Sequence, residues 1–231
     1  VGETNQGTGL LASAMRKLVP VAAPDHPTIY LIDKPNAPQS LILGGQLLPP
    51  TGEADAYIID MASQILGGSF NSRINMNLRE DKGWAYGART MTADALSQRP
   101  LLFYAPVQVD KTKESLQELI REAQAYISDQ PPTTEELDRF KASYVRSLPG
   151  KFETNRSVLG ALSGMVEFNR PLNYIEQQQR LIGELEVNDL LPAIAEHIQP
   201  AAMIWLIVGD LSQVQPVLEE AEIAPVIVLS P

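Results

Sequence analysis

The sequence predicts an α+β fold in which a largely antiparallel β-sheet packs against helices. Runs rich in β-branched and aromatic residues lie near the start, within 86–109 and again near residue 205. Elsewhere, apolar residues recur at helical spacing through most of the chain. Strands separated by long helical insertions suit a sheet with helices against one face.

Turn residues bound each expected strand. The expected strands are 28–32, 39–48, 86–92, 101–109 and 203–208. The first two are separated by a proline-rich turn, Pro35 to Pro38, and the next two flank the turn-like LSQRP. An antiparallel pairing of 86–92 with 101–109 is therefore expected.

Helices are expected wherever apolar residues share one face between capping signals. The expected ranges are 10–18, 55–66, 72–82, 111–128, 135–148, 154–168, 174–183, 188–198 and 212–221. Asn71 or Ser72 caps the third helix and Gly83 ends it, while Thr133 with Glu136 forms a capping box. We find no internal repeat or flexible linker, and we expect a single domain over residues 1–231.

Composition excludes several classes of protein. Apolar residues make up 44% of the chain and the net charge is −10, which favours a folded domain and disfavours an extended nucleic-acid or anionic-membrane surface. The chain has no cysteine, so disulfides, zinc fingers and cysteine nucleophiles are excluded. No apolar run approaches the roughly 18 residues of a membrane span. The first residue is not Met and no signal core follows it, so we expect a processed chain or a piece of a longer polypeptide.

The chain carries no self-contained catalytic motif. It has two histidines, His26 and His197, and in AIAEH the residue Ala193 stands where the first ligand of an HxxEH zinc motif would be. We expect both histidines to be surface or packing residues, and we expect no metal or cofactor to be bound by this chain. Walker A, GxGxxG and GxSxG motifs are also missing.

The run LGGSFNSRINMNLREDKGWAYGA, 66–88, resembles the non-catalytic half of the pitrilysin/insulinase family of zinc metallopeptidases. The resemblance extends through DKPNAPQS upstream and through TTEELDRFKASYVRSLPGKFET, PLNYIEQ and WLIVGDL downstream. In that family two homologous halves enclose a chamber. One half carries zinc on an HxxEH helix, and the other supplies an arginine and a tyrosine, seven residues apart, that bind substrate.

The resemblance assigns those two roles to Arg79 and Tyr86. It implies that this chain is the substrate-binding, non-zinc half of an endopeptidase for peptides or unfolded polypeptides. Helix 55–66 stands where the zinc half would carry HxxEH and lacks it. The chain alone is then inactive, and zinc belongs to an HxxEH-bearing partner, which is either part of the same polypeptide or a separate subunit. The resemblance also suggests a bacterial envelope or periplasmic location, on which composition is silent.

The chemistry of the pair fits this role. If Gly83 ends the helix, Arg79 lies on its last turns and Tyr86 enters the next strand, so both polar tips can converge. A guanidinium and a phenol are donors at neutral pH, suited to a peptide carbonyl or an oxyanion. The alternative is that Arg79 makes a surface ion pair and Tyr86 a strand contact. Trp84 either lines the chamber or fills core.

Two other functions stay open. Members of the superfamily also serve as structural subunits without catalysis, and a stand-alone peptide-binding module is a further possibility. A sheet edge is a further candidate for substrate contact, because an extended peptide can add to it as a strand. We expect Ser72 and Arg73 to organise the start of their helix instead of meeting substrate.

Overall fold

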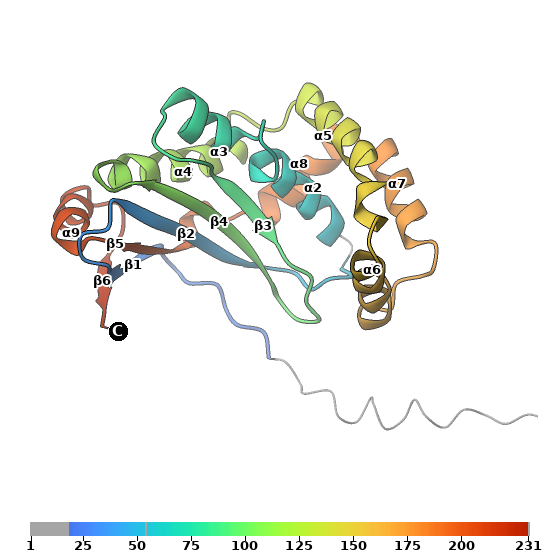
Figure 1. The fold of residues 1–231 in the computed structure, drawn as a ribbon, viewed down its shortest axis with the longest axis horizontal. Helices are drawn as coiled ribbons and strands as arrows, with labels where there is room; N and C mark the ends of the chain where they lie inside the picture. Colours follow the sequence, from blue (N-terminus) through green and yellow to red (C-terminus); the bar gives the residue numbers. More distant parts are fainter. Residues whose placement is uncertain (1–18, 54, 231) are drawn as a thin grey trace, which may run out of the picture.

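The computed structural model describes residues 19–53 and 55–230 (Figure 1). The strands are β1 (Thr28–Asp33), β2 (Gln39–Leu48), β3 (Arg89–Thr92), β4 (Arg99–Gln108), β5 (Ile204–Gly209) and β6 (Val226–Leu229). The α-helices are α2 (Ala56–Gly67), α3 (Arg73–Asn75), α4 (Thr112–Tyr126), α5 (Thr134–Ser147), α6 (Asn155–Glu167), α7 (Tyr174–Glu184), α8 (Val187–His197) and α9 (Leu211–Glu220). A π-helix, η1 (Met76–Asp81), continues α3, and three 3₁₀ turns are η2 (Val109–Lys111), η3 (Gly150–Phe152) and η4 (Pro200–Ala202).

The strands form one mixed sheet in the order β3-β4-β2-β5-β1-β6. Three neighbouring pairs, β3/β4, β4/β2 and β2/β5, are antiparallel. The pairs β5/β1 and β1/β6 are parallel. The α+β fold class is confirmed, including the antiparallel hairpin of β3 and β4.

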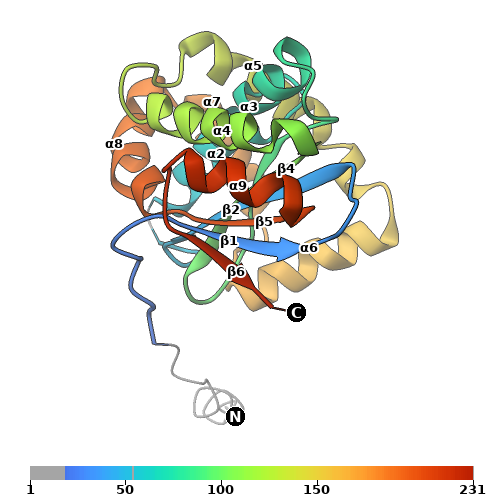
Figure 2. The ribbon, with the colours of Figure 1, turned by 90° about the vertical axis from the view of Figure 1, so that its left-hand side faces the viewer.

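Helices cover one face of the sheet (Figure 2), where α2, α4 and α9 pack against the strands and α8 packs against α2. The core between them includes the fully buried Ile42, Phe103 and Trp205. Gly44 lies opposite Trp205 on the neighbouring strand, and a Cβ at residue 44 would stand 2.5 Å from the indole. The missing side chain therefore makes room for the largest residue of the core.

The other face of the sheet is apolar and only half covered. Leu43 is aligned with Leu206 on one side and with Tyr104 on the other, and all three are half-buried. Ile204, on the same face, is 39% exposed. An apolar sheet face of this kind is a common site of contact between domains or subunits.

A buried arginine fixes α2 against the sheet. Arg99, 1% exposed, donates to both carboxylate oxygens of Asp60 at 2.9 and 3.0 Å. It also donates to the carbonyl oxygens of Pro49 at 2.8 Å and Ala56 at 3.0 Å. Since every one of these acceptors lies on or next to α2 or β2, the guanidinium ties the helix to the strands.

Most of the expected elements agree with the structure within a few residues, and Thr133 with Glu136 does form the capping box of α5. Strand β6 was not expected from the sequence. The run VIVL is short and follows the last helix, yet it pairs in parallel with β1. The expected helix at 10–18 lies outside the described residues.

The expected strand 86–92 was too long, because β3 begins only at Arg89. The preceding backbone is bonded elsewhere: Ala88 N–H donates to the side-chain oxygen of Asn75 at 3.0 Å. Ala85 makes a single bridge to Val107. Tyr86 therefore lies in a connecting segment that hydrogen bonds hold in place, and not in a strand.

Candidate functional site

A π-helical turn carries Arg79 to the surface. The expected single helix after Ser72 is α-helical only through Asn75 and then widens into η1, where Lys82 N–H donates to the carbonyl of Asn77 at 3.0 Å. Such turns are rare and occur often at functional sites. The helical segment ends as the sequence predicts, at Gly83, whose φ of 67° lies in the left-handed region that favours glycine.

The chain then folds back over the same turn. Trp84 and Ala85 N–H both donate to the carbonyl of Leu78, at 2.9 and 3.2 Å. This reversal brings the next residue, Tyr86, beside Arg79. The indole of Trp84 is half-buried and packs against the core, so core packing is its observed role.

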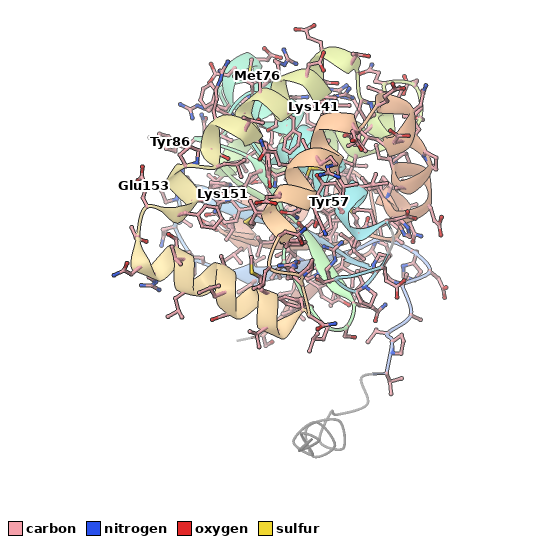
Figure 3. All side chains as sticks on the ribbon, turned by 90° about the vertical axis from the view of Figure 1, so that its right-hand side faces the viewer. Tyr57, Met76, Tyr86, Lys141, Lys151 and Glu153 are labelled. Carbon is pink, nitrogen blue, oxygen red and sulfur yellow. The ribbon has the colours of Figure 1, made fainter. Side chains whose placement is uncertain are left out.

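Arg79 and Tyr86 are in contact. The guanidinium carbon of Arg79 lies 5.4 Å from the centroid of the Tyr86 ring, within cation–π range. Tyr86 is 83% exposed and lies at the periphery of the molecule (Figure 3). Arg79 also pairs with Glu80 at 3.1 Å, an exposed contact of small energy. Both predicted site residues therefore meet at one accessible point.

Phe70 belongs to the same cluster and was not anticipated. Its ring centroid lies 4.7 Å from the Arg79 guanidinium carbon, and the residue is 55% exposed. The guanidinium therefore contacts two aromatic rings. Phe70 stands in the loop between α2 and α3, where no periodic pattern marks it. An aromatic residue two positions after a glycine pair, in a loop that buries little, is the one signal available.

Asn75, also missed, ties the parts of the cluster together. It is 5% exposed; its amide donates to the carbonyl of Phe70 at 2.6 Å, and its oxygen accepts from Ala88 N–H at 3.0 Å. One buried side chain thus holds both the Phe70 loop and the segment that carries Tyr86. Satisfied buried amides of this kind fix local geometry.

Arg73 braces the start of the helix, as expected. Its guanidinium donates twice to Glu136, both at 2.6 Å, and to the carbonyls of Gln130 and Pro131. It also stacks 4.9 Å from the ring of Tyr126. Burial alone would raise the pKa of Glu136, but the hydrogen bonds from Arg73 and Thr133 outweigh burial and lower that pKa.

A groove opens beside Tyr86, with a volume of about 470 Å³. Its walls are the 67–70 loop, the 86–89 segment and the half-buried side chains of Tyr104 and Pro106 on β4. Arg89 stands over the ring of Tyr104 at 4.7 Å. The groove therefore joins Tyr86 to Arg89, the first residue of the edge strand β3.

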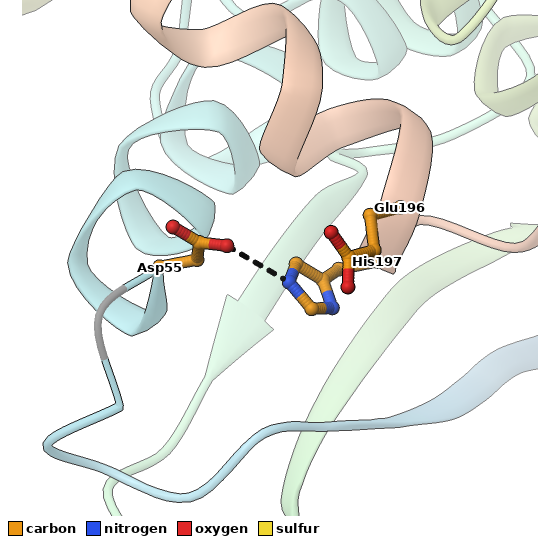
Figure 4. Close-up of side chains that lie close together, drawn as sticks. All are labelled: Asp55, Glu196 and His197. Atoms are coloured by element: carbon orange, nitrogen blue, oxygen red, sulfur yellow. Dashed lines mark hydrogen bonds and ion pairs between the residues drawn. The ribbon is translucent and has the colours of Figure 1, made fainter.

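The metal-binding capacity of the described residues is small. Helix α2, which stands where the family's zinc half carries HxxEH, contains no histidine. One His/Asp/Glu group of the described ranges, Asp55, Glu196 and His197, has ligand atoms within 4.8 Å of one another (Figure 4). There His197 Nε2 lies 3.3 Å from Asp55 Oδ2 and joins α8 to α2. A single imidazole at the meeting of two helices does not fit the family's zinc set.

The described residues form an α+β half-domain whose helix α2 carries no histidine. A family model described as the peptidase M16 inactive domain matches residues 10–144. The chain belongs to this family, which confirms the resemblance to the non-catalytic half of these zinc peptidases. A search of curated proteins found no match.

Solved structures share the fold at low sequence identity. An M16 inactive domain from Pseudomonas fluorescens is 24% identical over 84% of this chain, with a TM-score of 0.72. A protease from Helicobacter pylori is 19% identical over 83% of the chain, with a TM-score of 0.71. The present chain covers 46% and 48% of these two proteins and so spans about half their length.

A putative zinc protease from Bordetella pertussis is matched over nearly its whole length. The two are 22% identical over 73% of the present chain and 92% of the Bordetella protein, with a TM-score of 0.62.

Among residues 19–53 and 55–230, no helix is long and apolar enough to cross a bilayer.

Proposed function

We propose that this chain is the substrate-binding, non-zinc half of a zinc-dependent endopeptidase that cuts peptides or unfolded polypeptides. The observation that carries the proposal is the contact between Arg79 and the exposed Tyr86. Membership of the M16 inactive-domain family supports it. A zinc-bearing half would supply the metal and the attacking water, and this chain would supply two donors.

The two donors act without changing protonation. The guanidinium N–H groups and the phenol O–H can donate together to a peptide carbonyl oxygen, and they donate more strongly once that oxygen becomes negative. Phe70 and Tyr86 hold the guanidinium between them, so less order has to be created when substrate binds. Asn75 holds in place both the loop that carries Phe70 and the segment that carries Tyr86.

The proposed partner is an HxxEH-bearing half of the same superfamily. This chain spans about half the length of the two longer structural neighbours, which leaves room in such proteins for a second unit of similar size. The half-covered apolar face around Leu43 and Leu206 is a surface that such a partner would cover.

The test is cleavage of an unstructured quenched peptide by this chain alone, by the HxxEH-bearing half alone and by the two mixed. We expect only the mixture to cut, and size-exclusion chromatography should show the two halves eluting together. Cleavage by this chain alone would refute the proposed division of labour.

Two rival functions make different predictions in the same experiment. A structural subunit would associate with its partner but leave the mixture inactive. A stand-alone peptide-binding module would bind the peptide as a monomer and ignore the HxxEH half. The exposed and contacting Arg79–Tyr86 pair favours the substrate-binding half over a subunit that has lost catalysis.

A further inference from the structure

The groove beside Tyr86 differs in charge from four other hollows of the described surface. Those four, of about 160 to 810 Å³, each have at least two Asp or Glu residues in their walls. The groove has none, although the chain carries 28 acidic residues and a net charge of −10. Carboxylates in the walls therefore repel an anionic ligand less at this groove than at those four.

The groove also offers a cation. Arg89 is exposed, and no ion pair of the described residues includes it. Its guanidinium stacks on Tyr104 at 4.7 Å, which leaves the edge of the planar group free for a bidentate carboxylate. Arg79 contacts two residues of the groove wall, Phe70 and Tyr86.

Aromatic side chains form much of the groove wall. Phe70, Tyr86 and Tyr104 line the groove together with Pro106 and Gly87. These walls suit the methylene stem of a bound side chain or the side chain next to it in the peptide. The volume of about 470 Å³ is large enough for a few residues of an extended peptide.

We propose that this groove is a specificity subsite for an acidic residue of the substrate, whose carboxylate Arg89 binds while Arg79 and Tyr86 hold a nearby peptide carbonyl. The inference rests on the proposed function and refines it, because it names the class of peptide preferred. Arg89 is then a determinant of which peptides are cut, separate from the donors that act on the reacting carbonyl.

The test compares matched peptides in the mixture of this chain with its HxxEH-bearing half. One series carries a single Glu, moved one position at a time along an otherwise uncharged peptide, and the second series carries Gln instead. We expect kcat/KM to favour Glu over Gln by about three- to tenfold at one position, the size of a partly exposed charge-assisted contact. Arg89→Gln should reduce that ratio to about one.

Two matched variants separate a specific contact from bulk charge. Arg180→Gln removes one positive charge from an exposed position on α7, outside the groove, and should leave the Glu/Gln ratio unchanged. Arg89→Lys keeps the charge but loses the planar fork, so it should restore only part of the preference. Equal loss in Arg89→Gln and Arg180→Gln would overturn the subsite.

A binding measurement distinguishes failure of the subsite from failure of the proposed function. Fluorescein-labelled Glu and Gln peptides are titrated into this chain alone, and anisotropy reports affinity without any cleavage. If Glu binds more tightly and Arg89→Gln removes the difference while the mixture stays inactive, the subsite stands and the peptidase role falls. If Arg79 and Tyr86 variants abolish cleavage but no position prefers Glu, the subsite falls alone.

Discussion

The guanidinium carbon of Arg79 lies 5.4 Å from the ring of Tyr86 and 4.7 Å from the ring of Phe70. Three segments therefore meet at one point: the α2–α3 loop, the π-turn and the segment before β3. The left-handed Gly83 and the return bonds to the carbonyl of Leu78 bring the last two together, and the side chain of Asn75 bonds to the loop. Phe70 and Tyr86 are exposed, and the buried side chain of Asn75 underneath them fixes the backbone that carries both.

Replacing either donor should remove catalysis without removing the fold. In the mixture with the HxxEH-bearing half, we expect Arg79→Ala or Tyr86→Phe to lower kcat/KM by about 10²-fold, the effect of losing one oxyanion donor. Tyr86→Phe keeps the ring and its contact with Arg79, so it isolates the hydroxyl. The measurement is steady-state cleavage of an uncharged quenched peptide.

The matched control for this pair is Tyr174→Phe, a half-buried tyrosine at the start of α7, outside the groove. It should leave kcat/KM unchanged. Unaltered kinetics in both Arg79→Ala and Tyr86→Phe would contradict the roles assigned to the pair, whatever the other variants do.

The position of the pair follows partly from the sequence. Gly83 as a helix stop, with residues 79 and 86 on its two sides, is enough to predict that the chain reverses between them. The π-turn is not predictable, because apolar spacing in so short a segment fits either kind of helix. Residue propensities predict a strand at Tyr86. They do not reveal that the side chain of Asn75 accepts the hydrogen bond of Ala88 N–H, which keeps this segment out of the sheet.

The wider fold shows the same division. The long helices and β2 follow from periodicity and turn residues, and β2 spans its expected 39–48. The run VIVL has the composition of a strand. Its partner β1 cannot be predicted, because no hairpin turn links these four residues to a neighbouring strand. Phe70 and Arg89 gain their roles only from neighbours far along the chain, which one sequence does not reveal.

Phe70 should act by holding Arg79. We expect Phe70→Ala to lower kcat/KM for an uncharged peptide by about two- to fivefold, the effect of losing an exposed cation–π contact of about 0.5–1 kcal/mol. Phe70→Tyr keeps the ring and should stay near wild type. Both are measured in the mixture of the two halves.

A double-mutant cycle checks that Phe70 works through Arg79. In an Arg79→Ala background, Phe70→Ala should have no further effect on kcat/KM. A full, additive loss in that background would show that Phe70 contributes by another route and would exclude the positioning role.

Two glycines should respond to alanine with opposite signs. A Cβ on Gly67 would stand 2.4 Å from the backbone nitrogen of Thr90, so α2 can approach β3 only without one. Gly67→Ala should lower the free energy of unfolding by about 1–3 kcal/mol. Gly160, inside α6, has nothing within 4 Å, and Gly160→Ala should raise it by about 0.5–1 kcal/mol.

Urea denaturation of each glycine variant gives these values, provided that the m-value stays constant. Gly160→Ala serves as the control for the substitution itself, since both changes add one methyl group to a helix. A neutral Gly67→Ala would mean that α2 and β3 are not in close contact in solution.

The ion pair of Arg73 and Glu136 should make stability depend on acid. Because the folded-state pKa of Glu136 lies below its ordinary value of 4.5, the pair contributes fully above that value and is lost as the pH falls through the folded-state pKa. Glu136→Gln removes the charge but keeps a residue that fits the capping box. At pH 7 we expect it to lower the free energy of unfolding by about 1 kcal/mol.

Denaturation series at pH 7 and pH 3 should show this difference shrinking toward zero in acid. The control is Glu135→Gln, whose pair with Arg139 is exposed, and it should change the free energy of unfolding little at either pH. A difference of the same size at pH 3 would assign the loss to packing or capping and not to the charge of Glu136.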